Sequence, residues 1–138
     1  MIEFNCVSIN DTKKAAEYFA KFAKPGVCFA LFGDLGSGKT TFSQFLIKSI
    51  IPNVKYVPSP TFMIVQTYAG EKITVWHADC YRLIDKEEFF ELGLAEAFES
   101  CVTIIEWPEI IREFLPDNVI NITFSIEKNG RKIVSSYC

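Results

Sequence analysis

The segment Gly33–Thr40 constrains this chain most, because it matches in full the phosphate-binding pattern G-x-x-x-x-G-K-[ST]. It directly follows an apolar run at residues 27–32. In a strand–loop–helix unit, the glycines let successive N–H groups face phosphate oxygens, Lys39 adds a cation, and Thr40 supplies a hydroxyl for Mg²⁺. The pattern therefore predicts a nucleotide site on an α/β fold in which a buried strand leads into the loop and a helix follows it.

Length and composition indicate one domain spanning residues 1–138. The chain is 49% hydrophobic and 22% charged and contains 13 phenylalanines, which is enough to build a core. Its net charge of −3 argues against direct binding of RNA or DNA, because neutralising phosphates requires a basic surface. Any nucleic acid would therefore reach this protein through a partner.

Cysteine usage and the lack of export signals indicate a reducing compartment. The chain has 5 cysteines and no C-x-x-C pair, so we expect buried thiols rather than disulfides or zinc ligands. A run of about 20 apolar residues, as a membrane helix needs, does not occur. Residues 1–5 lack the basic and apolar regions of a secretion signal. We therefore expect a cytoplasmic protein with no membrane contact.

The apolar periodicity predicts alternating strands and helices. Helices are expected after a capping box at residues 8–11 and at residues 41–51 and 85–99. Strands are expected at residues 4–7, 27–32, 61–68, 72–77, 101–105, 118–126 and 131–135. This order favours a three-layer sandwich similar to that of P-loop NTPases. Its mixed sheet would have parallel central strands and antiparallel hairpins at the edges.

Two acidic residues are candidates for catalysis, because a phosphate loop needs carboxylates to hold Mg²⁺ and to orient the attacking water. Glu106 ends the apolar run at residues 102–105, where an acid would emerge from a buried strand beside the loop. Asp79 follows the apolar run at residues 73–76. An acid can also simply terminate a strand, but a nucleotide site must find its acids beyond the loop, and these two are the best placed.

Several further residues have both a functional and a purely structural interpretation. Thr61 lies in a proline-flanked segment that could sense the γ-phosphate or could be an ordinary turn. His77 has no neighbouring ligands at zinc spacing, so we expect a hydrogen bond that supports the site rather than a metal. Trp107 could pack in the core or beside the nucleotide. The candidate charge-stabilising arginines are Arg82, Arg112 and Arg131.

Taken together, four motifs make the chain similar to a known family. They are G-D-L-G-S-G-K-T-T at 33–41, S-P-T-F at 59–62, H-A-D-C-Y-R at 77–82 and I-E-W-P at 105–108. In this order and spacing they resemble the bacterial TsaE (YjeE) family over nearly the whole chain. The resemblance implies an ATPase of the pathway that makes threonylcarbamoyladenosine in tRNA. It also implies that the protein acts together with the TsaD and TsaB proteins and contacts tRNA only indirectly, through that complex.

The resemblance also implies roles for individual residues, with ATP and Mg²⁺ as cofactors. Thr40 and Glu106 would hold Mg²⁺, and Asp79, Thr61 and Trp107 would contribute to hydrolysis. Thr12 belongs to an S-x-x-x-T pattern that the family places near the nucleotide base. The loop residues expected to hold the triphosphate are Asp34, Leu35, Gly36, Ser37, Gly38, Lys39, Thr40 and Thr41.

Two alternatives to an ATPase remain open from the residues alone. A small-molecule kinase shares the loop but usually carries an arginine-bearing lid late in the chain, and no basic insertion of that kind is visible. A nucleotide-dependent switch with little hydrolysis would use Glu106 and Asp79 for Mg²⁺ affinity only. A guanine-specific switch is disfavoured because the chain has no N-K-x-D motif.

Overall fold

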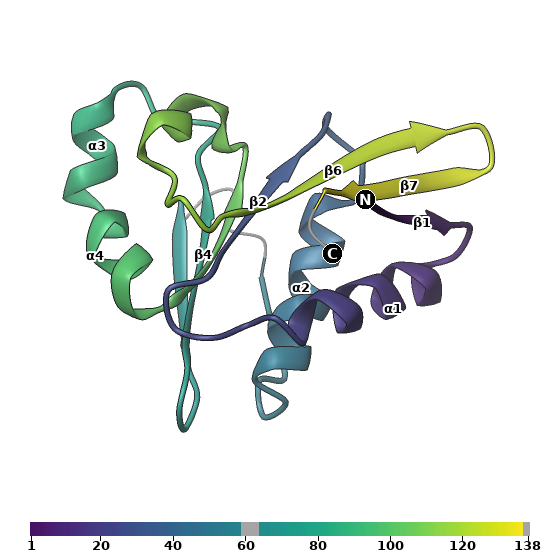
Figure 1. Ribbon diagram of the computed structural model, residues 1–138, viewed down its shortest axis with the longest axis horizontal. Coiled ribbons are helices and arrows are strands. Elements are labelled where there is room, and N and C mark those ends of the chain that lie inside the picture. Colours follow the sequence, from purple (N-terminus) through teal and green to yellow (C-terminus); the bar gives the residue numbers. More distant parts are fainter. Residues whose placement is uncertain (59–63, 137–138) are drawn as a thin grey trace.

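The computed structural model describes residues 1–58 and 64–136, and these contain a seven-stranded sheet with the order β1-β7-β6-β2-β5-β4-β3 (Figure 1). The strands are β1 (Ile2–Cys6), β2 (Cys28–Phe32), β3 (Val65–Ala69), β4 (Thr74–Asp79), β5 (Val102–Glu106), β6 (Ile120–Glu127) and β7 (Gly130–Ser135). The helices are α1 (Ile9–Ala20), α2 (Lys39–Ile50), α3 (Lys86–Glu91) and α4 (Leu94–Ser100), with a 3-10 helix, η1 (Pro108–Phe114).

The strand directions confirm the predicted mixed sheet. The central strands β6, β2, β5 and β4 run parallel to one another. Antiparallel pairs complete the edges, with β3 on β4 at one side and β7 on β6 at the other, where β1 also joins β7. Because parallel strands end at the same edge, the carboxyl ends of β2, β5 and β4 lie together.

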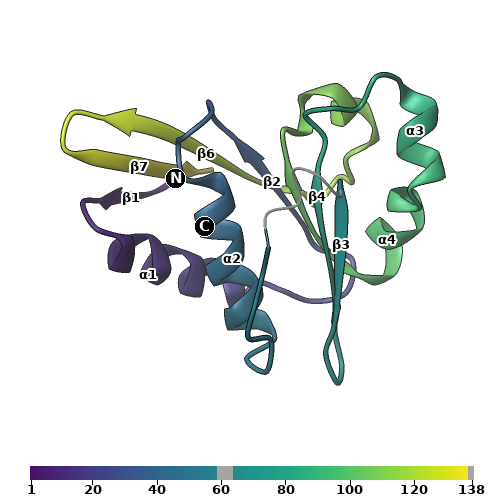
Figure 2. The same ribbon diagram turned by 180° about the vertical axis from the view of Figure 1, so that it is seen from behind.

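Helices cover the sheet on both faces, which confirms the three-layer prediction. Seen from behind in Figure 2, α1 and α2 lie on one side of the sheet, and α3 and α4 lie on the other. Side chains alternate between the faces of a strand. In β2, Phe29 and Leu31 accordingly pack in the core with Phe19 of α1 and Leu46 of α2, whereas Cys28 packs in a second core with residues of α3 and α4.

The predicted capping box sets the start of α1. The Ser8 hydroxyl accepts the N–H of Asp11, and the Asp11 carboxylate accepts the N–H groups of Ser8 and Val7 at 3.1 and 3.0 Å. These bonds satisfy backbone donors that would otherwise be unpaired at the helix N-terminus. They also hold the chain between β1 and α1 in one conformation, which matters because this turn borders the candidate site.

The structure differs from the predicted elements after β4. The helix expected at residues 85–99 is two short helices, because Gly93 has a left-handed φ of 83° and starts α4 anew. After β5 the chain turns into η1, which the sequence pattern did not predict. The 59–62 motif lies outside the described residues. No helix in residues 1–58 and 64–136 has the length and apolarity to cross a bilayer.

Candidate functional site

Three strand ends meet at one edge of the sheet. β2 leads into the phosphate loop, β5 ends at Glu106 and β4 ends at Asp79. The register pairs Glu106 with Leu31 of β2 on one side and with Asp79 on the other. Both acids predicted from the sequence therefore lie beside the loop, at the position where open parallel sheets usually bind ligands.

Glycines in the phosphate loop meet two different requirements. Gly36 and Gly38 have left-handed φ angles of 78° and 104°, which glycine adopts without steric cost. Gly33 also has a positive φ, of 154°, and in addition lacks space, because a Cβ would lie 2.7 Å from the Phe124 carbonyl oxygen and 2.7 Å from Ser37 Oγ. The loop then opens directly into the 12-residue helix α2, whose N-terminal N–H groups and dipole favour an anion.

Lys39 is a buried cation at the start of α2. Its side chain is 5% exposed, and its Nζ donates a hydrogen bond to the Gly33 carbonyl. The same Nζ lies 3.3 Å from the centroid of the Trp107 ring, a cation–π contact. Burial lowers the pKa of Lys39, whereas the negative charges of Glu106 and Asp79 act in the opposite direction. The Lys39 Nζ thus lies at the loop where phosphates would bind.

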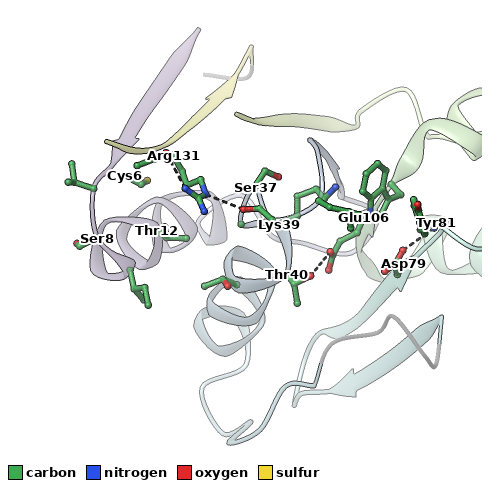
Figure 3. A pocket seen from close by; sticks show the side chains of 18 of the residues that line it. Cys6, Ser8, Thr12, Ser37, Lys39, Thr40, Asp79, Tyr81, Glu106 and Arg131 are labelled. Carbon is green, nitrogen blue, oxygen red and sulfur yellow. Dashed lines mark hydrogen bonds between the residues drawn. The ribbon is translucent and has the colours of Figure 1, made fainter. Parts of the chain in front are cut away.

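Glu106 is the centre of a buried hydrogen-bond chain. The Thr40 hydroxyl donates to Glu106 Oε1 at 2.8 Å, as drawn in Figure 3. His77 Nε2 lies 2.6 Å from Glu106 Oε2. Glu106 is 2% exposed and His77 is fully buried. Among the described residues, each oxygen of this carboxylate therefore has one hydrogen-bond partner, from α2 on one side and from β4 on the other.

Asp79 and Trp107 form the opposite wall from α2. Asp79 Oδ1 accepts the N–H of Tyr81 at 2.9 Å, which turns the chain sharply after β4. The Tyr81 ring packs on the Trp107 ring with centroids 4.8 Å apart. Trp107 itself has a left-handed φ of 56°, a strained conformation for a bulky residue. This turn directs the indole over Lys39 rather than into the core.

These groups surround a cavity of about 600 Å³. At the end away from Glu106, the cavity is bordered by Thr12 of α1 and Arg131 of β7. Arg131 Nε donates to the Gly36 carbonyl at 3.2 Å, so the C-terminal hairpin is tied to the phosphate loop (Figure 3). The volume falls in the range of small-molecule sites and suits an extended ligand such as a nucleotide.

The donor set fits Mg²⁺. Thr40 Oγ1 and Glu106 Oε1 are 2.8 Å apart, and adjacent ligands of octahedral Mg²⁺ are separated by roughly 3 Å when each bond is about 2.1 Å. Both are hard oxygen donors, which this ion prefers. Within residues 1–58 and 64–136, no group of three or more His, Cys, Asp or Glu side chains forms a metal cluster. The remaining ligands would come from phosphates and water, as is usual for Mg²⁺ at nucleotide sites.

Comparison with known proteins identifies the family. The family model described as "Threonylcarbamoyl adenosine biosynthesis protein TsaE" matches residues 6–133. The chain belongs to the TsaE family. Among the relatives named tRNA threonylcarbamoyladenosine biosynthesis protein TsaE, those of Rickettsia bellii and Bacillus subtilis are 40% and 38% identical. The matches cover 91% and 88% of this chain and 88% and 75% of theirs.

A solved structure supports the same assignment. The crystal structure of Bacillus subtilis YdiB aligns with a TM-score of 0.79 at 30% identity. The alignment covers 97% of this chain and 83% of that one. The resemblance to TsaE expected from four short motifs is thereby confirmed over nearly the full length.

Most site residues expected from the loop and from the TsaE resemblance line the cavity. These are Thr12, Leu35, Gly36, Ser37, Gly38, Lys39, Thr40, Thr41, Asp79, Glu106 and Trp107. Asp34 is exposed and is not among the lining residues; its carbonyl accepts the N–H of Ser37 at 3.1 Å. Thr61 lies outside the described residues. The roles of all these residues stay predictions.

Sequence reasoning did not predict some of the cavity residues, and it did not say which of the three candidate arginines lies at the site. Cys6 and Tyr81 line the cavity without having been singled out as ligand contacts. Among the three candidate arginines, Arg82 and Arg131 line it, whereas Arg112 lies over the Phe32 ring at a separate cavity. For Cys6 and Arg131 the missing signal was the pairing of β1 with β7, in which these two residues lie opposite each other.

Proposed function

We propose that this protein is the ATP-binding and ATP-hydrolysing component of the machinery that makes threonylcarbamoyladenosine in tRNA, and that it acts in the cytoplasm with TsaD and TsaB. Membership of the TsaE family supports the pathway, because the family and the relatives are named for threonylcarbamoyladenosine biosynthesis. The single observation that carries the catalytic part is the gathering of Lys39, Thr40 and Glu106 around one cavity.

In this proposal the chain works mainly by holding charges in place. Backbone N–H groups of the loop and the Lys39 ammonium bind the β- and γ-phosphates. Thr40 and Glu106 hold Mg²⁺, which when bound neutralises negative charge on the phosphate oxygens. We assign Asp79 to orient the attacking water, because it is 7% exposed and lies next to Glu106 in the register. Trp107 covers Lys39 and limits the access of solvent to it.

We further propose that the partner proteins stimulate hydrolysis. Arg131 is bonded to the Gly36 carbonyl and Arg82 also has an interaction within this chain, which favours a partner as the source of a further transition-state cation. Apolar side chains at the cavity rim favour a protein surface there, since Val7, Ile9 and Leu35 are 74%, 69% and 70% exposed. The net charge of −3 disfavours naked tRNA, so tRNA would be reached through the complex.

The test is ATP hydrolysis by the purified protein, alone and in a titration with TsaB and TsaD. We expect slow hydrolysis that rises with the partners and is lost in Lys39→Ala. A rate that stays flat across the titration would contradict partner stimulation. Failure to bind ATP at all would overturn the nucleotide assignment.

The switch alternative is tested with Glu106→Gln, which keeps the shape of the side chain but removes its charge. If the protein is an ATPase, hydrolysis falls while nucleotide binding in the absence of Mg²⁺ stays near that of the wild type. If it is a switch, the wild type binds ATP without measurable turnover under every condition, and Glu106→Gln changes Mg²⁺ affinity alone.

A further inference from the structure

His77 is the most deeply buried ionisable group beside the site, and the function proposed above assigns it no task. It lies in β4 with an exposed fraction of 0%, between the neighbouring strands β3 and β5. Its Cα partner in β5 is Ile104, so Glu106 lies two residues further along on the same face. The imidazole thus meets the carboxylate on one face of the sheet.

The proposed Mg²⁺ role of Glu106 sets the direction of this hydrogen bond. A carboxylate that holds a metal is ionised and can only accept, so in that state His77 Nε2 donates to Glu106 Oε2, 2.6 Å away. His77 Nδ1 is buried and has no hydrogen-bond partner in the described part of the chain. Among the described residues, Glu106 is therefore the hydrogen-bond partner of the His77 ring.

Within the described residues, the two oxygens of Glu106 have different partners. Oε2 is occupied by His77 at the back, and Oε1 is the atom that meets the Thr40 hydroxyl. Without the imidazole, the carboxylate could rotate and present either oxygen. The Glu106 charge would also have one hydrogen-bond partner fewer, which is costly because this residue is only 2% exposed.

We propose that His77 is a positioning residue for Mg²⁺-dependent nucleotide binding, because it fixes the Glu106 carboxylate with Oε1 toward Thr40. This inference rests on the proposed function, in which Thr40 and Glu106 hold Mg²⁺. Residues that orient metal ligands by hydrogen bonds commonly contribute 10–100-fold to metal affinity or activity.

The test measures ADP binding by isothermal titration calorimetry, in excess MgCl₂ and in EDTA. The readout is the Mg²⁺ enhancement, defined as the Kd in EDTA divided by the Kd in MgCl₂. We expect His77→Met, which keeps a side chain of similar bulk without the donor, to lower the enhancement about tenfold or more. Its Kd in EDTA should stay near that of the wild type, because the loop and Lys39 are untouched.

Two amide variants separate hydrogen bonding from packing even if His77→Met does not fold. His77→Gln can place an amide N–H near the position of Nε2, whereas the shorter His77→Asn carries the same group but does not reach Oε2. We expect Gln to keep the enhancement within about threefold of the wild type and Asn to lower it as Met does. Thr103→Val, a buried β-strand change on the opposite face of β5, serves as the matched control and should leave the enhancement unchanged.

The outcomes distinguish this inference from the proposed function. Equal enhancement in the Gln and Asn variants, or a loss of affinity in EDTA as large as that in MgCl₂, would overturn the role of His77 alone. A wild-type Kd that does not change between EDTA and MgCl₂ would overturn the Mg²⁺ assignment of Glu106, and this inference with it.

Discussion

The two ends of the cavity are built in different ways. At the phosphate end, Thr40 and His77 both bond to Glu106, and the carboxylate and the imidazole of this chain are almost completely buried, at 2% and 0% exposure. At the far end, Thr12 is partly exposed, and Arg131 makes an exposed bond to a backbone carbonyl. A buried chain tolerates little change, because each lost partner leaves another polar group unsatisfied. We therefore expect substitutions to cost far more at the phosphate end.

The largest effect is expected at Gly33, beneath the phosphate end. In Gly33→Ala the new methyl group would collide with the Phe124 carbonyl oxygen, so we expect the free energy of unfolding to fall by about 3 kcal/mol. Gly36→Ala is the matched control. It meets nothing within 4 Å, and its left-handed φ of 78° should cost only about 1 kcal/mol. Urea denaturation measures both, and equal losses would contradict the steric argument.

Thr40→Val tests the buried chain itself. The change keeps the branched shape but removes the hydroxyl that donates to Glu106 and would bind Mg²⁺. We expect kcat/KM for ATP hydrolysis to fall about 100-fold, which corresponds to about 2.7 kcal/mol. Steady-state kinetics measures this loss. Thr123→Val, a change on the exposed face of β6, is the control. A loss below about threefold would remove Thr40 from the metal site.

Arg131→Ala tests the far end where it touches the loop. Losing the bond to the Gly36 carbonyl and a cation of the cavity wall should weaken nucleotide binding about tenfold, or about 1.4 kcal/mol. The loss should be the same in MgCl₂ and in EDTA, because Arg131 lies away from Glu106. Lys132→Ala, at the next residue and on the other face of β7, is the control. A loss confined to MgCl₂ would mean that the two ends are not independent.

The smallest effect is expected for Thr12→Val. Thr12 is partly exposed, so water can replace whatever its hydroxyl contacts, and a single neutral hydrogen bond contributes about 1 kcal/mol or less in such a setting. We expect ATP to bind about threefold more weakly, with the Mg²⁺ enhancement unchanged. Calorimetry with ATP measures this, and a loss as large as that of Thr40→Val would reverse the contrast between the ends.

What could be predicted from the sequence depends on whether a feature follows from a local pattern or from the pairing of distant segments. The loop, Glu106 and Asp79 were predictable because a local rule places acids at the ends of buried parallel strands, beside the loop that follows another such strand. The hydrogen bond of His77 to Glu106 depends on the register between β4 and β5, which no local pattern specifies. The place of Arg131 depends on β7 lying between β6 and β1, a pairing of distant segments.

The missed details of the fold have local physical causes. Residues 85–99 keep a helical pattern of apolar residues on both sides of Gly93, so periodicity alone does not reveal the break. Trp107 takes its left-handed conformation in a tertiary setting, over Lys39 and against Tyr81. The left-handed backbone of Trp107 then leads the chain into η1. In the sequence, the local sign of this helix is the proline at its first position.

The position of β1 at the sheet edge has a consequence for synthesis. Of the described strands, β1 emerges from the ribosome first and its partner strand β7 last. Because long-range pairing must wait for both segments, β1 stays without its partner while the parallel strands β2, β5 and β4 can already pair with one another. The turn that follows β1 carries Ser8 and Thr12 to the cavity. A nascent chain can therefore complete its phosphate loop well before the rest of the pocket closes around it.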